Sequence, residues 1–383
     1  MALRTGLLML PAYAPARLAE LAALAEDTGY DDFWLADERF FRDVYACLTL
    51  CALRTRRIRL GPGVTDPYSR HPALTAMAIA TLDEISNQRA VLGIGAGVSG
   101  FRELGVHASR SAVAIREAVA LIRRLLAGET VTVNGREISF TDGRLDFAPP
   151  RPDLPIYVAS QRAGGCRAAG QVADGAIMQG ALADPLVRFL RDTVHDAARQ
   201  AGRDPARVAL VARLNVCVAD DRSAARNVMR PTLVRSLVAQ RPDFFTFATA
   251  GLTLPAGLRE KVLALSYTHD PAPLRAVAPD VPDEFVDAVT LTGPADVIAP
   301  EVVRLARSGI AEVMVFPLAL DGRIETTIER FQSEVMPRVR AELGNSEGGF
   351  APLPNLPPGQ GCAGEAGART RRDRERLPDR PLG

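Results

Sequence analysis

Short apolar runs alternate along this chain with longer segments of helical periodicity, and this alternation restricts the folds that it can adopt. Alternating strands and helices build parallel sheets. We expect eight strands, at Leu7–Leu10, Phe33–Ala36, Ile58–Thr65, Ala90–Gly95, Ile156–Ser160, Gly175–Gln179, Val208–Val218 and Glu312–Pro317. We expect helices near Pro15–Thr28, Val44–Thr55, His71–Ile85, Ala112–Ala127, Gly165–Val172, Pro185–Ala201, Pro294–Ser308 and Ile324–Leu343. Eight strands, each followed by a helix, predict a closed (β/α)₈ TIM barrel, with an open doubly wound sheet as the alternative.

Two segments interrupt this rhythm. Residues 129–150 contain two short β-prone runs on either side of Asn134-Gly135, which predicts a surface hairpin with a type I′ turn. Residues 228–292, after the seventh strand, form a long insertion that includes Phe245, Phe247 and Tyr267. Long insertions often act as lids over a site. The alternative is that these aromatic side chains pack the insertion onto the barrel.

The chain is predicted to form one barrel domain over residues 1–344, with the insertion inside it. From about Asn345 the composition changes to Gly, Pro, Ala and Arg without periodicity. Such a segment cannot bury enough apolar surface to offset its conformational entropy. Residues 345–383 are therefore expected to be a disordered tail without a catalytic role.

Composition and charge exclude several classes of function. The chain has 46 Lys and Arg against 45 Asp and Glu, so its net charge predicts neither a nucleic-acid nor a membrane-surface partner. No apolar run approaches the roughly 20 residues of a membrane span. The five cysteines include no C-x-x-C pair, which favours reduced thiols in a cytoplasmic protein and predicts no metal site. Cys47 and Cys51, one helical turn apart, are expected to pack in the core.

Polar residues follow the second and third predicted strands. Asp37 and Glu38 come after the second strand, and Thr65 and Asp66 end the third. Active sites of barrel enzymes lie at the carboxyl ends of the strands, so carboxylates there are candidates for acid–base chemistry. Helix capping or a surface position is the alternative for each of them. His71 directly precedes a proline, which favours a structural role at a helix start.

A glycine motif follows the fourth predicted strand. Gly95-Ala96-Gly97-Val98-Ser99-Gly100 satisfies the G-x-G-x-x-G pattern of dinucleotide-binding folds. That fingerprint requires the first strand, an immediate helix and an acidic residue about 20 positions later, and none of these is present. Residues without side chains at a strand end instead allow the backbone to approach a flat ring closely.

A second glycine-containing segment, Ser160–Cys166, links the fifth strand to its helix. Free backbone N–H groups at a helix start attract anions, and Arg162 or Arg167 would add positive charge. A phosphate site is one interpretation of this segment, and an ordinary turn is the other.

Taken together, these segments resemble the bacterial luciferase-like monooxygenase superfamily, and within it the F420-dependent methylenetetrahydromethanopterin reductases and their relatives. The order and spacing of the motifs match over residues 1–180, and residues 180–345 match only in overall plan. The motifs are Phe33–Glu38, Gly63–Pro72, Thr81–Ser86, Leu92–Gly97 and Ala173–Gly175.

The resemblance implies a barrel, usually dimeric, that holds a deazaflavin ring at its carboxyl-terminal mouth. The residues that it places around the ring are Asp37, Thr65, Asp66, Gly95, Ala96 and Gly97. Those that it places at the phosphate side of the cofactor are Ser160, Gly164, Gly165 and Cys166. It also implies a non-proline cis peptide bond, in a bulge against the ring, between Gly63 and Val64.

The activity that the resemblance implies is hydride transfer between C5 of coenzyme F420 and an electrophilic carbon of a small organic substrate, such as a C=N, iminium or C=C carbon. Reduction also needs a proton, and a carboxylic acid supplies it near neutral pH only when burial raises its pKa. Glu103 is the expected donor, and Glu38 and His107 are the other candidates. Glu38 stands where alcohol- and sugar-oxidising members carry a histidine, which argues against that chemistry.

Two alternatives to this activity stay open at the level of sequence. The first is an FMN-dependent monooxygenase on the same barrel, because FMN and F420 both present a tricyclic ring and a phosphate. The second is a catalytically silent cofactor-binding protein. A homodimer is expected from the resemblance alone.

Overall fold

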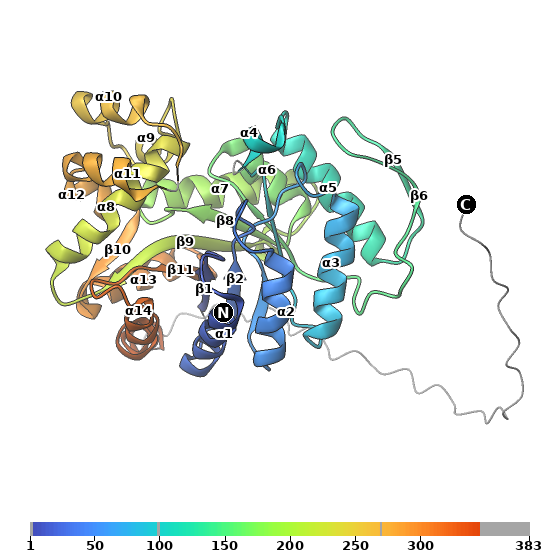
Figure 1. The fold of residues 1–383 in the computed structure, drawn as a ribbon, viewed down its shortest axis with the longest axis horizontal. Helices are drawn as coiled ribbons and strands as arrows, with labels where there is room; N and C mark the ends of the chain where they lie inside the picture. Colours follow the sequence, from blue (N-terminus) through green and yellow to red (C-terminus); the bar gives the residue numbers. More distant parts are fainter. Residues whose placement is uncertain (1–2, 98–99, 269, 345–383) are drawn as a thin grey trace, which may run out of the picture. The chain divides into compact units, whose positions relative to one another are not determined.

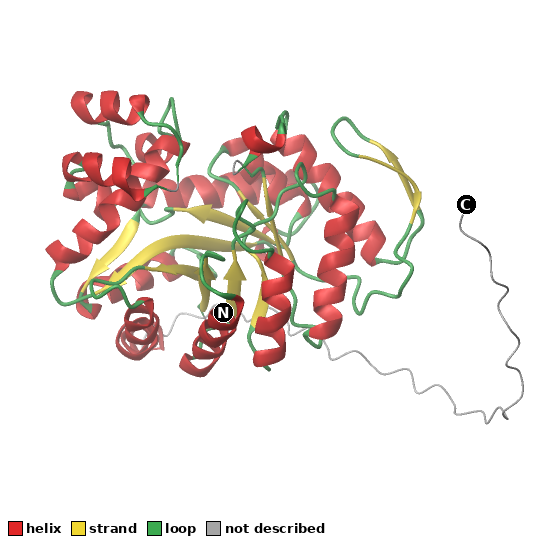
Figure 2. Ribbon diagram, in the orientation of Figure 1, coloured by secondary structure: helices red, strands yellow, loops and turns green. Residues whose placement is uncertain are grey.

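Parallel strands surrounded by helices form the body of the protein in the computed structural model, which describes residues 3–97, 100–268 and 270–344 (Figures 1 and 2). The hydrogen-bonded order is β3-β2-β1-β11-β9-β8-β7-β4. The bounds are β1 (Arg4–Met9), β2 (Asp32–Leu35), β3 (Arg59–Pro62), β4 (Leu92–Gly95), β7 (Ile156–Ala159), β8 (Gly175–Gln179), β9 (Ala209–Val218) and β11 (Glu312–Pro317).

The two ends of this strand order meet and close the barrel. Leu60 pairs with Ala90, and Thr65 pairs with Ile94, in parallel bridges. The predicted closed barrel is therefore confirmed, and the open doubly wound sheet is excluded. The predicted tail, 345–383, lies outside the described residues.

Helices follow the strands on the outside of the barrel. They are α1 (Pro15–Thr28), α2 (Val44–Arg54), α3 (Pro72–Ile85), α4 (Phe101–Leu104), α5 (Ser111–Leu126), α6 (Ala163–Val172), α7 (Asp184–Gln200), α13 (Ala295–Arg307), α14 (Ile324–Arg330) and α15 (Met336–Gly344). Short 3-10 turns at Pro205–Arg207 and Ala278–Asp280 and a π turn at Phe331–Val335 complete the helical segments. Within the described ranges, no helix combines the length and the apolarity that a membrane crossing needs.

Local sequence explains where these helices begin and what they bury. His71 caps α3, because its Nδ1 accepts a hydrogen bond from the N–H of Ala73 at 3.1 Å. Its predicted structural role is thereby confirmed. Cys47 and Cys51 are both buried on the inner face of α2, as their helical spacing predicts.

The predicted hairpin is present, but its predicted turn is wrong. β5 (Val131–Asn134) and β6 (Ser139–Gly143) are antiparallel, and Asn134 pairs with Ser139, which leaves residues 135–138 in the loop. The side chain of Glu117 on α5 accepts three backbone N–H groups of this loop, each at 2.9 Å, from Arg136, Glu137 and Ile138. This tertiary anchor holds the loop in a conformation that Asn-Gly turn chemistry does not describe.

The insertion after β9 begins earlier than its predicted start at residue 228. Its elements are α8 (Arg222–Ala239), α9 (Phe245–Thr249), α10 (Ala256–Ala264), α11 (Pro271–Val277), α12 (Asp283–Asp287) and β10 (Thr290–Gly293). The sequence pattern missed β10, which is four residues long and pairs only with the carboxyl-terminal part of β9. Phe247 packs against Phe285 of α12, with ring centroids 5.4 Å apart and the rings tilted by 32°, so this contact lies within the insertion itself.

A tryptophan and a charged cluster fill the barrel near the amino ends of its strands. Trp34 is fully buried, and its Nε1 donates to Oε1 of Glu312 at 3.1 Å. Arg4 donates to Oε2 of Glu312 at 2.8 Å, and Arg59 binds both carboxylate oxygens of Asp32. Burial, and secondly the charge of Asp32, raise the pKa of Glu312 to about 7 against the opposing effect of the arginines. A buried charge is tolerated only when it is paired in this way.

The strands β3 and β4 approach so closely that only glycine fits between them. A Cβ added at Gly61 would lie 1.6 Å from the carbonyl oxygen of Val91, and one added at Gly93 would lie 2.4 Å from that of Pro62. Both obstacles are backbone atoms, which cannot rotate out of the way. This seam is where the barrel closes.

We therefore expect Gly61→Ala to destabilise the protein by about 3 kcal/mol or more, because the added methyl must push two hydrogen-bonded strands apart. The measurement is urea unfolding followed by circular dichroism. Gly257→Ala is the matched control: Gly257 lies in α10 with no atom within 4 Å of the added Cβ. It is expected to be neutral or to stabilise by up to about 1 kcal/mol. Equal effects of the two substitutions would contradict the account of the seam.

Candidate functional site

A cavity opens at the carboxyl ends of the strands, where the sequence predicts the site. Its volume is about 360 Å³, and a second hollow of about 280 Å³ adjoins it. The larger hollow is in the size range of small-molecule sites, about 300–1,000 Å³, and the smaller one lies just below it. The residues that line both are Leu8, Gly63, Val64, Gly97, Gln161, Gln179 and Arg213.

Most residues that the resemblance assigned to a ring site line these two hollows. Gly63-Val64 and Gly95-Ala96-Gly97 contribute backbone and small side chains, and the Gly63–Val64 peptide bond is cis, as the resemblance implied. Asp37 and Asp66 line the larger hollow and Ser160 the smaller one. Val98 and Ser99 of the glycine motif lie outside the described residues.

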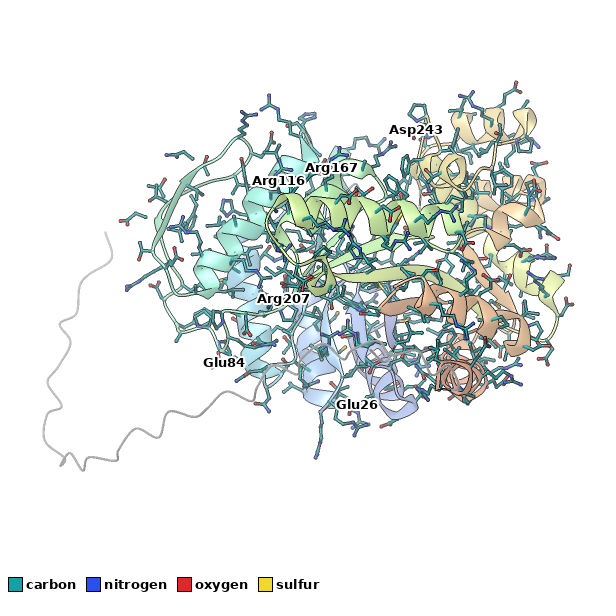
Figure 3. The ribbon with its side chains drawn as sticks, turned by 180° about the vertical axis from the view of Figure 1, so that it is seen from behind. Glu26, Glu84, Arg116, Arg167, Arg207 and Asp243 are labelled. Atoms are coloured by element: carbon teal, nitrogen blue, oxygen red, sulfur yellow. The ribbon has the colours of Figure 1, made fainter. Side chains whose placement is uncertain are left out.

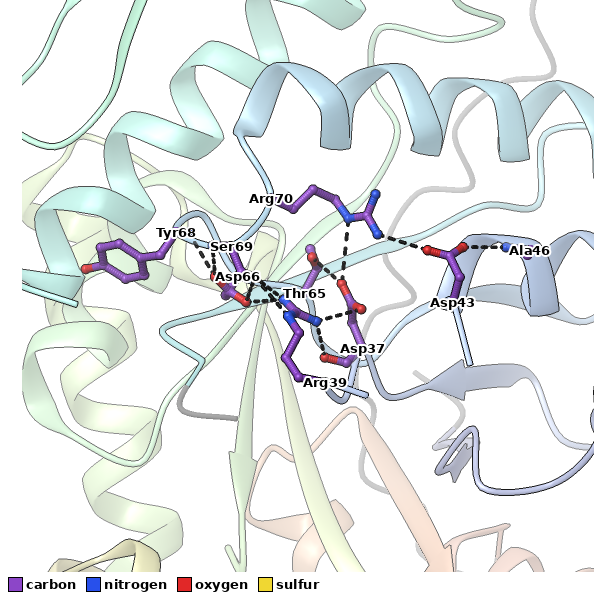
Figure 4. Close-up of polar contacts among 9 residues, drawn as sticks. All are labelled: Asp37, Arg39, Asp43, Ala46, Thr65, Asp66, Tyr68, Ser69 and Arg70. Atoms are coloured by element: carbon purple, nitrogen blue, oxygen red, sulfur yellow. Dashed lines mark hydrogen bonds and ion pairs between the residues drawn. The ribbon is translucent and has the colours of Figure 1, made fainter. Parts of the chain in front are cut away.

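Asp37 and Asp66 are tied together by one arginine that sequence reasoning did not single out. Arg39 forms a 2.8 Å ion pair with Asp37 and a second ion pair with Asp66 (Figure 4). Thr65 is fully buried, and its Oγ1 donates to Oδ2 of Asp37 at 2.7 Å. Thr65 thus acts through Asp37 rather than at the cavity wall. Arg70 is the other cation at Asp37, at 3.8 Å (Figure 4).

The second carboxylate, Asp66, orders the loop that follows β3. Its Oδ1 accepts the backbone N–H groups of Tyr68 and Ser69 at 2.9 and 2.8 Å. Its Oδ2 accepts the hydroxyl of Ser69 at 2.6 Å and binds Arg39 (Figure 4). With its oxygens engaged in this way, Asp66 is a positioning group rather than a proton donor.

The predicted phosphate segment is only partly in the cavity wall. The Oγ of Ser160 accepts the N–H of Arg162 at 3.0 Å just before α6, and Gly164 and Gly165 form the first turn of that helix. The thiol of Cys166 is buried, and this burial raises its pKa to about 12. Cys166 therefore offers no side chain to a ligand, and Arg162 is already paired with Asp243.

The geometry does not support Glu103 as the proton donor. Glu103 lies on the exposed helix α4, outside the cavity lining, and pairs with Arg102 at 2.9 Å. Its pKa is lowered by a backbone hydrogen bond and by Arg102, whereas a donor near neutral pH needs a raised one. His107 is also exposed and outside the lining. Glu38, in contrast, is half-buried and lines the larger hollow.

Sequence reasoning missed several side chains of the cavity wall. Arg213 on β9, Arg235 on α8, and Tyr267 in the insertion all line the larger hollow. Burial raises the pKa of Tyr267, and the nearby charge of Glu38 raises it further. Arg213 left a signal in the sequence, since it is the one charged residue in the apolar run Val208–Val218. Tyr267 was noted in the sequence only as an aromatic residue of the insertion, and Arg235 left no signal, because only folding brings the insertion to the barrel mouth.

We expect Arg39→Met to lower the free energy of unfolding at pH 7 by about 2–4 kcal/mol, because two largely buried carboxylates lose their shared cation. Arg162→Met is the matched control. The side chains of Arg162 and Asp243 are about half exposed, at 53% and 50%, against 14% for Arg39 and 8% for Asp37. Figure 3 labels Asp243. The control is expected to change stability by less than about 1 kcal/mol. Urea unfolding of both variants measures the difference, and an effect of Arg39→Met no larger than that of the control would contradict it.

Comparisons with known proteins agree with this architecture. The family model described as luciferase-like monooxygenase matches residues 3–312. The 5,10-methylenetetrahydromethanopterin reductase of Archaeoglobus fulgidus is 33% identical over 321 residues, which cover 83% of this chain and 94% of that protein. The F420-dependent glucose-6-phosphate dehydrogenase of Nakamurella multipartita is 30% identical over 292 residues, covering 72% and 83% of the two chains.

A solved structure of a related protein has the same fold. The coenzyme F420-dependent tetrahydromethanopterin reductase from Methanopyrus kandleri superposes with a TM-score of 0.77 at 26% identity, covering 88% of this chain and 100% of that chain. The family model spans residues 3–312, which run from the first strand into the last. The chain therefore belongs to the luciferase-like monooxygenase family.

Proposed function

We propose that this protein is an F420-dependent oxidoreductase acting on an electrophilic carbon, such as a C=N, iminium or C=C carbon, of a small organic molecule. The observation that carries the proposal is a backbone-lined cavity at the barrel mouth with carboxylates at its edge. Two relatives support the choice of cofactor. One, at 30% identity, is named as F420-dependent, and the other, at 33% identity, is named as a methylenetetrahydromethanopterin reductase. Matches to FMN enzymes have 20% identity or less and support the fold alone.

The residues of the cavity fit a flat ring of the deazaflavin type. Gly63-Val64 and Gly95-Ala96-Gly97 line it without long side chains, so a planar ring meets backbone rather than mobile groups. Asp37 stands at the same wall, fixed by Arg39 and Thr65. When bound, F420 supplies or accepts a hydride at C5. The protein's part is to hold the ring and the substrate together and to keep water out.

Glu38 is the group that we propose as proton donor. It lines the cavity and is half-buried, and Tyr267 of the insertion lies near it. Asp37 and Asp66 are held by arginine and are proposed to position the cofactor.

Parallel titrations of the purified protein with F420 and with FMN test the proposal. We expect F420 to bind at least tenfold more tightly than FMN, followed by the change in cofactor fluorescence. Reduced F420 is then offered a panel of iminium, C=N and C=C compounds, and its reoxidation is the activity readout. Tighter binding of FMN than of F420 would contradict the proposed hydride transfer and would favour an FMN-dependent monooxygenase. Tight F420 binding without turnover of any compound would favour a silent binding protein.

In the same assay, Glu38→Gln is expected to lower kcat by about 10²–10⁴-fold while the affinity for F420 changes less than threefold, because the amide cannot donate an acidic proton. Glu103→Gln is the matched control, an identical change on an exposed helix, and is expected to retain full activity. A larger loss with Glu103→Gln than with Glu38→Gln would reverse the assignment.

The partner that we propose is a second copy of this chain. Leu50 and Leu53 on α2 and Leu74 and Met77 on α3 are exposed apolar side chains on two neighbouring helices. Light scattering is expected to give twice the chain mass, and Leu53→Asp to give monomers. A monomeric wild-type protein would refute the dimer.

We also propose a cytoplasmic location. It is supported by the buried free thiols of Cys47, Cys51, Cys166 and Cys217.

A further inference from the structure

One wall of the cavity carries a cation without a counter-ion. Nη1 of Arg213 donates to the amide oxygen of Asn215 at 3.0 Å, and its guanidinium carbon lies 4.7 Å from the ring centroid of Phe316. Both partners are neutral. Within residues 3–97, 100–268 and 270–344, no carboxylate forms an ion pair with Arg213. The guanidinium is thus oriented but not neutralised.

A second arginine stands beside it. Arg235 on α8 lines the same hollow and, in the described part of the chain, forms neither an ion pair nor a hydrogen bond. The side chain of Arg213 is partly exposed to the cavity, and the packing around it removes part of the water from its guanidinium. This desolvation, and secondly the charge of Arg235, lower the pKa of Arg213 to about 10. Two poorly compensated cations side by side are unfavourable in the absence of an anion.

The other charges of the cavity do not relieve this excess. Arg39 forms ion pairs with both Asp37 and Asp66, and Arg70 lies 3.8 Å from Asp37, so these two carboxylates have cations of their own. Glu38 also lines the cavity, and its charge and that of Arg235 both act on Tyr267, but no carboxylate is among the charges that shift the pKa of Arg213. The positive charge is therefore concentrated on the wall made by β9 and α8.

We propose that the substrate carries an anionic group, a carboxylate or a phosphate, and that Arg213 and Arg235 bind it together. This inference rests on the proposed function, in which the cavity takes a small reducible molecule. Guanidinium groups match the paired oxygens of such anions, and Asn215 and Phe316 fix Arg213 before the ligand arrives, which lowers the entropy cost of binding. The substrate class is thereby narrowed to acids and phosphorylated compounds.

The experiment measures stabilisation by inorganic phosphate, used as the probe anion. We expect phosphate to raise the Tm of the wild-type protein, and Arg213→Gln and Arg235→Gln to weaken its apparent affinity at least tenfold. Without phosphate, both variants are expected to unfold at or above the wild-type Tm, because an uncompensated charge has been removed. A merely structural arginine would lower the Tm instead.

Arg207→Gln is the matched control. Arg207 is an exposed arginine on the turn before β9, on the face seen in Figure 3, and it is expected to leave the phosphate effect unchanged. Arg213→Lys, which keeps a charge at the site, is expected to retain part of the effect and replaces Arg213→Gln if that variant does not fold.

Three outcomes distinguish between failure of the anion site, of the substrate assignment and of the proposed function. An equal phosphate effect in the wild type and in both glutamine variants overturns the inference. A tenfold loss of F420 affinity in Arg235→Gln assigns the site to an anion of the cofactor and overturns the substrate assignment. A wild-type protein that fails to bind F420 but loses its phosphate effect in both variants keeps the anion site and refutes the proposed function.

Discussion

The contact between β3 and β4 determines both the fold and the cavity. At this seam the Cβ of any residue other than glycine at position 61 would overlap the backbone of Val91, so the barrel closes only because side chains are missing there. The same feature continues toward the strand ends, where Gly63, Gly95 and Gly97 line the cavity. Closure and a flat, backbone-lined wall are therefore two consequences of one packing constraint.

Arginine side chains of the barrel occur in three kinds of charge arrangement. Near the amino ends of the strands, the buried Glu312 is paired with the partly buried Arg4. At the mouth, Arg39 is shared between Asp37 and Asp66, which shapes the loop after β3. On β9, Arg213 has only neutral partners. Since a protein gains nothing from an unneutralised cation in a packed wall, this last arrangement is where a ligand is expected to complete the structure.

The sequence pattern predicted elements well wherever the signal was local. Pro15–Thr28 has the bounds of α1, and the capping role of His71 was evident from the proline that follows it. Prediction failed where distant residues decide the conformation. The loop of the hairpin follows Glu117 rather than its own Asn-Gly pair, and β10 exists because β9 is long enough to offer it an edge.

The residues of the candidate site also differ in whether the sequence alone could predict them. Residues on the strand ends, such as Asp37, Glu38, Gly63 and Gly95, were found because a barrel gathers all carboxyl strand ends at one mouth. Glu103 lies outside the cavity lining, and its position in the chain, after the fourth strand, did not predict whether its helix turns inward or outward.

The sequence by itself determined the barrel, the mouth at which its polar strand ends meet and the family to which these motifs belong. Periodicity, turn residues and glycine positions act over a few residues and can be followed along the chain. The tertiary structure alone decided which acid reaches the cavity, which arginines are neutralised and how Tyr267 comes to lie near Glu38. Burial and charge pairing are properties of neighbours in space, and Glu38 and Tyr267 lie more than two hundred positions apart in the chain.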